Sequence, residues 1–233
     1  MEQQLETLAN GVSIVVDEHC RISEDGILLA RFAAPQPTDT ACDLGSGNGI
    51  IPLYWYAHKS PARCVAVERE AAFAALAHAS VAANNAHEKI TVMHADWNAL
   101  DAIPAASMTL VTCNPPYFAY NASRPSPDPL RRAARQEDSP AMLTQLCRAA
   151  KRLLADDGRF CLCHRPERLD DVFAALREAD LKPCRLQFVH TRDGDAPWLF
   201  LLESRSRGTL QVAAPLIRHT RGTHTAVYRR LYR

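Results

Sequence analysis

The stretch Met108-Thr-Leu-Val-Thr-Cys-Asn-Pro-Pro-Tyr117 sets the frame for the rest of the chain. Its first six residues form an apolar run that predicts a buried parallel strand, so the quartet from Asn114 to Tyr117 should follow the end of that strand. Ligands of open α/β sheets bind at the carboxyl ends of strands. Because Pro115 and Pro116 lack N–H groups and fix the backbone, nearby carbonyls are free to accept hydrogen bonds from a ligand. We expect a rigid, acceptor-rich turn that suits a planar group with an amino nitrogen; a plain Pro-Pro turn is the alternative.

The composition indicates one ordinary soluble domain. The 233 residues are 47% hydrophobic and 23% charged, which allows a substantial core. No apolar run approaches the roughly 18 residues of a membrane span, and the N-terminus Met-Glu-Gln-Gln-Leu-Glu is unlike a signal peptide. We therefore expect a cytoplasmic protein without a membrane partner, and no obligate protein partner is evident.

The charge is unevenly distributed, although the net charge is only +1. Residues 1–100 carry 6 basic and 12 acidic side chains, residues 101–203 carry 14 of each, and residues 204–233 carry 7 arginines and no acid. A basic end with Tyr228 and Tyr232 among its arginines fits RNA, through phosphate contact and base stacking, and a solvated tail is the equal alternative. The loop 119–139 places Arg124, Arg131 and Arg132 beside the Asn114 turn and is expected to be a mobile flap.

The eight cysteines are scattered and include no C-x₂-C pair, so neither a zinc site nor a disulfide framework is indicated. Cys161 and Cys163 alternate in a predicted strand and are expected to be buried, reduced thiols on one face. His94 and His164 fall at strand ends without partners at metal-ligand spacing. We predict no metal site.

From residue 40 onward, strands and helices alternate, which predicts a mostly parallel sheet with helices on both faces. The expected strands are 40–44, 63–67, 89–94, 108–113, 159–163, 182–190 and 198–202, and the expected helices are 50–58, 71–84, 139–154 and 169–179. A turn at residues 192–195 joins the last two strands into a hairpin, so one strand should be antiparallel. Gly158 is expected to end the third of these helices with a positive φ.

Three segments are expected around this core. Residues 1–38 include a short helix that begins near Ser23 or Asp25. This segment is expected to cover a cofactor and a substrate bound at the strand ends, and Arg21 is a candidate for closing over the cofactor. Residues 39–204 form the core domain, and residues 205–233 form the basic C-terminal segment.

A glycine-rich loop, Asp43-Leu-Gly-Ser-Gly-Asn-Gly49, follows the first strand of the alternation. Gly45, Gly47 and Gly49 let the backbone turn sharply and approach a ligand, as in nucleotide sites. The G-x-G-x-G spacing favours S-adenosylmethionine over a dinucleotide, and so do two carboxylates. Asp43 precedes the loop and would hold the positively charged methionine part, while Glu68 at the end of the second strand would accept both ribose hydroxyls. Asp96 would accept from the adenine amino group, and a helix cap is its near-equal alternative.

The order of glycine loop, acidic strand end, later Asp and Asn114-Pro-Pro-Tyr117 resembles the class I S-adenosylmethionine-dependent methyltransferases that act on amino nitrogens. The resemblance implies a Rossmann-like fold with a seven-stranded, mostly parallel sheet in the order 3-2-1-4-5-7-6, strand 7 being antiparallel.

A narrower similarity covers nearly the whole chain. Its residues are Arg21-Ile-Ser-Glu-Asp25, Ile27-Leu-Leu-Ala30, Asn114-Pro-Pro-Tyr-Phe118, Arg159-Phe160, Arg165-Pro-Glu-Arg-Leu169, Val189-His190 and Pro215-Leu216. They are similar to the bacterial valine-tRNA adenine-N(6) methyltransferases, which implies the adenosine immediately 3′ of the anticodon as substrate. His19-Cys20 and Ala226 depart from the pattern that we expect for this group, and they weaken the exact substrate assignment.

In the chemistry that follows, the Asn114 side-chain oxygen and the Pro115 carbonyl accept the two hydrogens of an adenine amino group, which aims the nitrogen lone pair at the methyl. Tyr117 would stack on the extruded base and Phe118 would form a second wall. Arg131 and Arg132 are expected to contact the RNA. A protein glutamine amide also presents NH₂, so glutamine methylation is the alternative, and a catalytically silent RNA-binding scaffold is another.

Overall fold

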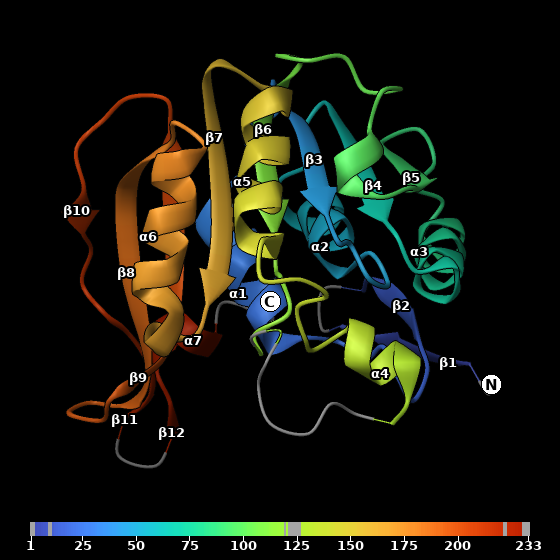
Figure 1. The fold of residues 1–233 in the computed structure, drawn as a ribbon. Helices are drawn as coiled ribbons and strands as arrows, with labels where there is room; N and C mark the ends of the chain where they lie inside the picture. The colour runs from blue at the N-terminus through green and yellow to red at the C-terminus, as the bar shows by residue number, and fades with distance from the viewer. Residues whose placement is uncertain (1–2, 9–10, 119, 121–126, 221–222, 230–233) are drawn as a thin grey trace.

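The computed structural model describes residues 3–8, 11–118, 120, 127–220 and 223–229 (Figure 1). The strands of its main sheet are β3 (Thr40–Leu44), β4 (Arg63–Glu68), β5 (Ile90–His94), β6 (Met108–Cys113), β7 (Leu154–His164), β8 (Lys182–Arg192), β9 (Pro197–Arg205), β10 (Gln211–Val212), β11 (Leu216–Thr220) and β12 (Thr223–His224). They pair in the order β12-β11-β8-β9-β7-β6-β3-β4-β5, and β10 pairs with β8.

The expected α/β architecture with a mostly parallel sheet is confirmed. The strands from β3 to β7 pair in parallel, and β9 lies antiparallel between β7 and β8. From β5 to β8 the path therefore reads 3-2-1-4-5-7-6 by position in the chain. The expected count of seven strands is too low, because β10, β11 and β12 extend the sheet to ten within the described residues.

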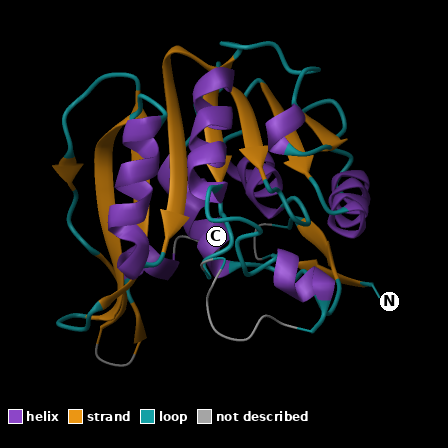
Figure 2. Ribbon diagram, viewed as in Figure 1, coloured by secondary structure: helices purple, strands orange, loops and turns teal. Residues whose placement is uncertain are grey.

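Helices cover both faces of the sheet (Figure 2). They are α1 (Glu24–Ala33), α2 (Ile50–His58), α3 (Ala71–Ala83), α4 (Pro129–Ala133), α5 (Met142–Leu153), α6 (Leu169–Glu178) and α7 (Ala226–Arg229), with 3₁₀ turns η1 (Trp97–Ala99) and η2 (Pro166–Arg168). Helices α1 and α2 pack into one apolar cluster, and α5 and α6 pack into a second cluster on the opposite face. Both layers leave the carboxyl ends of the parallel strands free for a site.

The N-terminal segment contributes to the main core. Ser23 caps α1 by accepting a hydrogen bond from the Gly26 N–H at 3.2 Å, as its side chain suits. Ile27, Leu28 and Leu29 of α1 are at most 1% exposed. A hairpin of β1 (Gln4–Thr7) and β2 (Ser13–Val16) precedes α1 and packs on α3. Helix α1 is therefore an integral part of the fold, and the covering role of residues 1–38 stays a prediction.

The expectation that Gly158 ends the third core helix with a positive φ is wrong. Helix α5 stops at Leu153, and β7 begins at once with Leu154, so residues 156–158 lie inside a strand. Gly158 is required for a different reason: a Cβ there would stand 2.9 Å from the Met108 carbonyl oxygen, near a shift in the β6–β7 register. Glycine is therefore needed at this position because it has no side chain, and not because the backbone adopts a positive φ.

The described part of the basic C-terminal segment is folded onto the domain. Arg218 forms an ion pair with Glu24 of α1 at 3.4 Å, and Tyr228 is only 1% exposed and stacks on His224. The expectation that Tyr228 stacks on RNA bases is therefore wrong, because its ring is used in packing. Arg229 is exposed. The other residues of interest here, Arg221, Arg230, Tyr232 and Arg233, lie outside the described residues.

The cysteines agree with a reduced protein. All eight are free thiols, and Cys161 and Cys163 are fully buried, as expected. Burial raises the pKa of Cys161 to about 12. In the described ranges, no group of His, Cys, Asp and Glu side chains is arranged to hold a metal ion. Nor does the described part of the chain contain a helix that is long and apolar enough to cross a membrane.

Candidate active site

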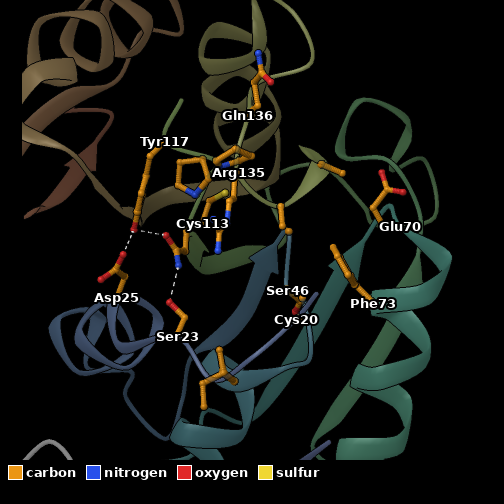
Figure 3. A pocket seen from close by; sticks show the side chains of 18 of the residues that line it. Cys20, Ser23, Asp25, Ser46, Glu70, Phe73, Cys113, Tyr117, Arg135 and Gln136 are labelled. Carbon is orange, nitrogen blue, oxygen red and sulfur yellow. Dashed lines mark hydrogen bonds between the residues drawn. The ribbon is translucent and has the colours of Figure 1, made fainter. Parts of the chain in front are cut away.

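A cavity of about 1200 Å³ opens where β3, β4, β6 and β7 end. Its volume exceeds the roughly 300–1,000 Å³ of a typical small-molecule pocket, so it has room for two ligands side by side. The glycine loop and the end of β4 form one side of the cavity. The turn after β6, the residues after the end of β7 and the start of β9 form the other side. Figure 3 shows the lining side chains near the centre.

The glycine loop is held in a form that side chains would disturb. Gly45 and Gly47 have φ values of 72° and 57°, which L-residues rarely adopt. A Cβ on Gly45 would stand 3.3 Å from the Trp97 ring, and one on Gly47 would stand 3.4 Å from Cys20 Sγ. The loop therefore presents bare backbone to the cavity, between two side chains that bound the space.

Glu68 joins this loop to the end of β4. Its carboxylate accepts hydrogen bonds from the Gly47 N–H and the Glu70 N–H, each at 2.8 Å. The side chain lines the cavity and is 7% exposed. Burial raises its pKa, and the two backbone N–H groups oppose that change. Because each carboxylate oxygen can accept more than one hydrogen bond, Glu68 keeps acceptor capacity for ligand hydroxyls.

Asp43 lies beneath the loop and not among the residues that line the cavity. It is 1% exposed and accepts hydrogen bonds from Thr112 Oγ1 at 2.6 Å and Ser46 Oγ at 3.1 Å. Burial raises its pKa to about 7. Its position does not favour the direct ligand contact that the sequence suggested. The carboxyl instead ties the loop to β6 through Ser46 and Thr112.

Asp96 acts as a helix cap. Its side chain accepts from the Asn98 N–H at 2.8 Å at the start of η1, and it does not line the cavity. The neighbouring Trp97 does line it. The structure thus contains the helix-cap arrangement, and an adenine contact by Asp96 stays a prediction without a supporting contact.

Asn114 directly follows the end of β6 and lines the cavity, and its amide is held by side chains from other parts of the chain. Figure 3 shows two of these side chains, Ser23 and Tyr117, with Asp25 beside Tyr117. Asn114 Oδ1 accepts from the Tyr117 hydroxyl at 2.7 Å and from the Cys163 thiol at 3.1 Å, and Asn114 Nδ2 donates to Ser23 Oγ at 3.4 Å. The Tyr117 hydroxyl also reaches Asp25 Oδ2 at 2.7 Å. Burial raises the pKa of Asp25, against the effects of Tyr117 and Arg165.

The rest of the Asn114 turn lies along the same wall. Pro115, Pro116, Tyr117 and Phe118 all line the cavity. Phe118 is 57% exposed, so one face of its ring is open for a further contact. The ring of Tyr117 packs against His164, with centroids 5.3 Å apart. His164 is fully buried and supports the turn through this contact with the Tyr117 ring.

The loop that the sequence places over the site contains structure of its own. Helix α4 begins after Asp128, which caps it, and the backbone of Phe118 pairs with Arg135 and Glu137. Arg131 lines the cavity, whereas Arg132 does not. Arg124 lies outside the described residues.

Four residues at the site were not assigned a role from the sequence. Cys20, Arg165 and Trp198 line the cavity, and Cys163 donates a hydrogen bond to Asn114. Cys163 and Trp198 come from strands whose alternation carries no sign of function. Arg165 belongs to a recognisable motif, Arg165-Pro-Glu-Arg-Leu169, which could have marked it as part of the site.

Most of the chain matches known proteins. Residues 23–170 match the family model described as the methyltransferase small domain. A protein of Aeromonas hydrophila named tRNA1(Val) (adenine(37)-N6)-methyltransferase is 31% identical over 214 residues, which cover 89% of this chain and 86% of the relative. A protein of the same name from Porphyromonas gingivalis is 30% identical, with 81% of this chain and 76% of the relative covered.

Solved structures share the fold. A predicted O-methyltransferase from Agrobacterium tumefaciens superimposes with a TM-score of 0.70 at 22% identity, over 89% of this chain and 95% of that one. The tRNA m1G37 methyltransferase of M. jannaschii gives a TM-score of 0.62 at 13% identity, over 89% of this chain and 55% of that one. At these identities the likeness concerns the fold.

Proposed function

The chain belongs to the methyltransferase small domain family and, within it, to the tRNA1(Val) (adenine(37)-N6)-methyltransferase group, and from that premise we propose that it methylates the N6 amino group of an adenosine in tRNA, next to the anticodon. It is an S-adenosylmethionine-dependent N-methyltransferase. The observation that carries the proposal is the position of Asn114, whose amide lines the same cavity as the glycine loop and Glu68.

The donor side of the cavity fits S-adenosylmethionine. The backbone of Gly45 and Gly47 is bare toward the cavity, and Trp97 and Phe73 supply apolar walls for an aromatic base. In our proposal, Glu68 accepts from the ribose hydroxyls, while Asp43 supports the loop from below through Ser46. The bound cofactor supplies a methyl group activated by a positively charged sulfur.

The acceptor side provides hydrogen-bond acceptors for an amino group. Asn114 Oδ1 and the carbonyl oxygen of Pro115 each accept a hydrogen bond from the amino group of the target adenine. The lone pair of the amino nitrogen then faces the donor side of the cavity. Catalysis then depends on orientation and on fixed dipoles, which require no strong base for the attack. Tyr117 and Phe118 contact the extruded base, and Arg131 contacts the RNA.

The proposal is tested by methyl transfer to defined acceptors. Purified protein is incubated with labelled S-adenosylmethionine and valine tRNA transcripts that carry adenosine or guanosine at position 37, and nucleosides are then identified by mass spectrometry. We expect about one N6-methyladenosine per tRNA with adenosine 37 and none with guanosine 37. Label that appears in a protein extract on glutamine, with none in tRNA, would favour amide methylation instead.

A further inference from the structure

Arg165 and Trp198 meet at the acceptor side of the cavity. Arg165 follows the end of β7, and Trp198 lies at the start of β9. Because β9 is antiparallel to β7, with His164 opposite Phe200, the start of one strand lies beside the end of the other. Both residues line the cavity together with Tyr117.

The guanidinium of Arg165 is fixed in place. Arg165 Nη1 donates to the Trp198 carbonyl oxygen at 2.8 Å. The guanidinium carbon lies 4.9 Å from the centre of the Tyr117 ring and 5.6 Å from that of Trp198. A planar cation favours such contacts with aromatic faces. The side chain is thus held by a backbone carbonyl and two rings. These contacts leave its other N–H groups able to donate to a ligand.

The charge of Arg165 is not neutralised by an ion pair within the described residues, where no carboxylate lies within 4.0 Å of its nitrogens. Two other arginines at the cavity differ: Arg168 pairs with Glu137 at 3.0 Å, and Arg69 pairs with Asp138. Asp25 is close enough for Arg165 to lower its pKa, but the Asp25 carboxylate is engaged by the Tyr117 hydroxyl. Arg165 is therefore a preorganised cation beside the ring that is proposed to contact the base.

We propose that Arg165 binds the RNA phosphate that adjoins the target adenosine, while Tyr117 contacts the base of that adenosine. This inference rests on the proposed function. An extruded nucleotide carries its phosphates one ribose away from its base, so a cation that flanks Tyr117 is placed to reach one of them. Arginine suits the task because its N–H groups match two phosphate oxygens. Phosphate contacts of this kind set the register of a nucleic acid without reading its sequence.

The test removes the charge from each partner in turn. Full-length tRNA is assembled by ligation with a single neutral methylphosphonate linkage, placed either 5′ or 3′ of the target adenosine. Wild-type protein, Arg165→Ala and Arg165→Lys are compared by kcat/KM, and by tRNA affinity in the presence of S-adenosylhomocysteine. A charged hydrogen bond of this type corresponds to a loss of roughly 10- to 100-fold.

We expect Arg165→Ala to lose about that factor with unmodified tRNA, and one of the two methylphosphonates to cost the wild type a similar factor. On the tRNA with that methylphosphonate, kcat/KM of Arg165→Ala should equal that of the wild type, because the contact between Arg165 and the phosphate is absent in both cases. Arg165→Lys keeps a positive charge, so its kcat/KM should still fall when the phosphate is neutralised, but by a smaller factor than for the wild type. Arg177→Ala is the matched control: this exposed arginine lies in the last turn of α6, which runs away from the cavity.

The inference would be overturned if the loss from Arg165→Ala and the loss from the methylphosphonate multiplied at both linkage positions. It would also be overturned if the wild type kept full kcat/KM with each of the two neutral linkages. The second outcome does not depend on whether any variant folds. If wild-type protein does not methylate unmodified tRNA, the proposed function fails, and the affinity measurements then decide the phosphate contact separately. If methylation is normal and indifferent to Arg165, only the inference about Arg165 fails.

Discussion

The hydroxyl of Tyr117 lies 2.7 Å from Asn114 Oδ1, the oxygen that is proposed to accept the substrate amino group. The same hydroxyl lies 2.7 Å from Asp25 Oδ2. A phenol has one hydrogen, so Tyr117 can donate to only one of these acceptors at a time. With Cys163 also donating to Asn114 Oδ1, this acceptor is already engaged. A substrate amino group therefore has to replace one of these donors, and Asp25 offers the displaced hydroxyl another acceptor.

This arrangement predicts a small effect for one substitution of Tyr117 and a large loss for another. Tyr117→Phe keeps the ring and removes the competing donor, so kcat/KM should fall by less than about fivefold or rise, given that a neutral hydrogen bond is worth about 1 kcal/mol. Tyr117→Ala also removes the stacking surface and should lose roughly 5- to 150-fold. Steady-state kinetics with tRNA measures both. If Tyr117→Phe were as impaired as Tyr117→Ala, the hydroxyl itself would be required.

Asn114→Ala is expected to separate catalysis from cofactor binding. It removes the acceptor that orients the amino group, and removal of one preorganised polar group of this kind costs about 10²–10³ in kcat. Affinity for S-adenosylhomocysteine, measured by calorimetry, should change little, because Glu68 and the glycine loop are untouched. Asn98→Ala is the control, since Asn98 is exposed in η1 and does not line the cavity. A fully active Asn114→Ala protein would contradict the mechanism.

Glu68→Gln should weaken cofactor binding more than it affects kcat at saturating cofactor. Glu68 accepts N–H groups from Gly47 and Glu70 with separate oxygens. A glutamine amide has one oxygen, so its NH₂ group would face one of these donors and the loop would shift. Loss of a charged acceptor corresponds to roughly 10- to 100-fold in affinity, which titration with S-adenosylhomocysteine measures. Glu88→Gln, an exposed change before β5, should leave the affinity unchanged.

Local sequence signals predicted the first half of the fold well. The strand Thr40–Leu44, the helix Ile50–His58 and the strand Met108–Cys113 have the expected bounds. In each case an apolar run of ordinary length stops at glycine, proline or a polar residue, and these residues act locally. The same signals located Glu68 and Asn114 at the strand ends that line the cavity.

The remaining features depend on contacts between distant segments. Gly158 follows two aspartates, which suggests a helix end, yet it is used for the close approach of the Met108 carbonyl from another strand. Likewise, Trp198 joins the site only because β9 pairs antiparallel with β7. Asp43 precedes the glycine loop as a ligand residue would, but its direction beneath the loop is set by Thr112 on β6. No local pattern encodes these pairings.

Asp43 predicts a pH-dependent term in stability. Burial raises the pKa of its carboxyl from 3.8 to about 7. The folded protein therefore holds this proton more tightly than the unfolded chain does. Its contribution to the free energy of unfolding is most favourable below about pH 4, is lost as the pH rises to about 7, and is constant above that. At 1.36 kcal/mol per unit, the full change is roughly 4 kcal/mol.

Asp43→Asn should remove this dependence, because an amide stays neutral and its oxygen can still accept from Thr112. Relative to the wild type, the variant is expected to gain free energy of unfolding steadily between pH 4 and pH 7, measured by urea denaturation of cofactor-free protein. Asp101→Asn, a change at an exposed position, should show no such trend. A difference between Asp43→Asn and the wild type that stays constant from pH 4 to pH 7 would mean that Asp43 is ionised across this range, and that the hydrogen bonds from Thr112 and Ser46 offset the effect of burial at least fully.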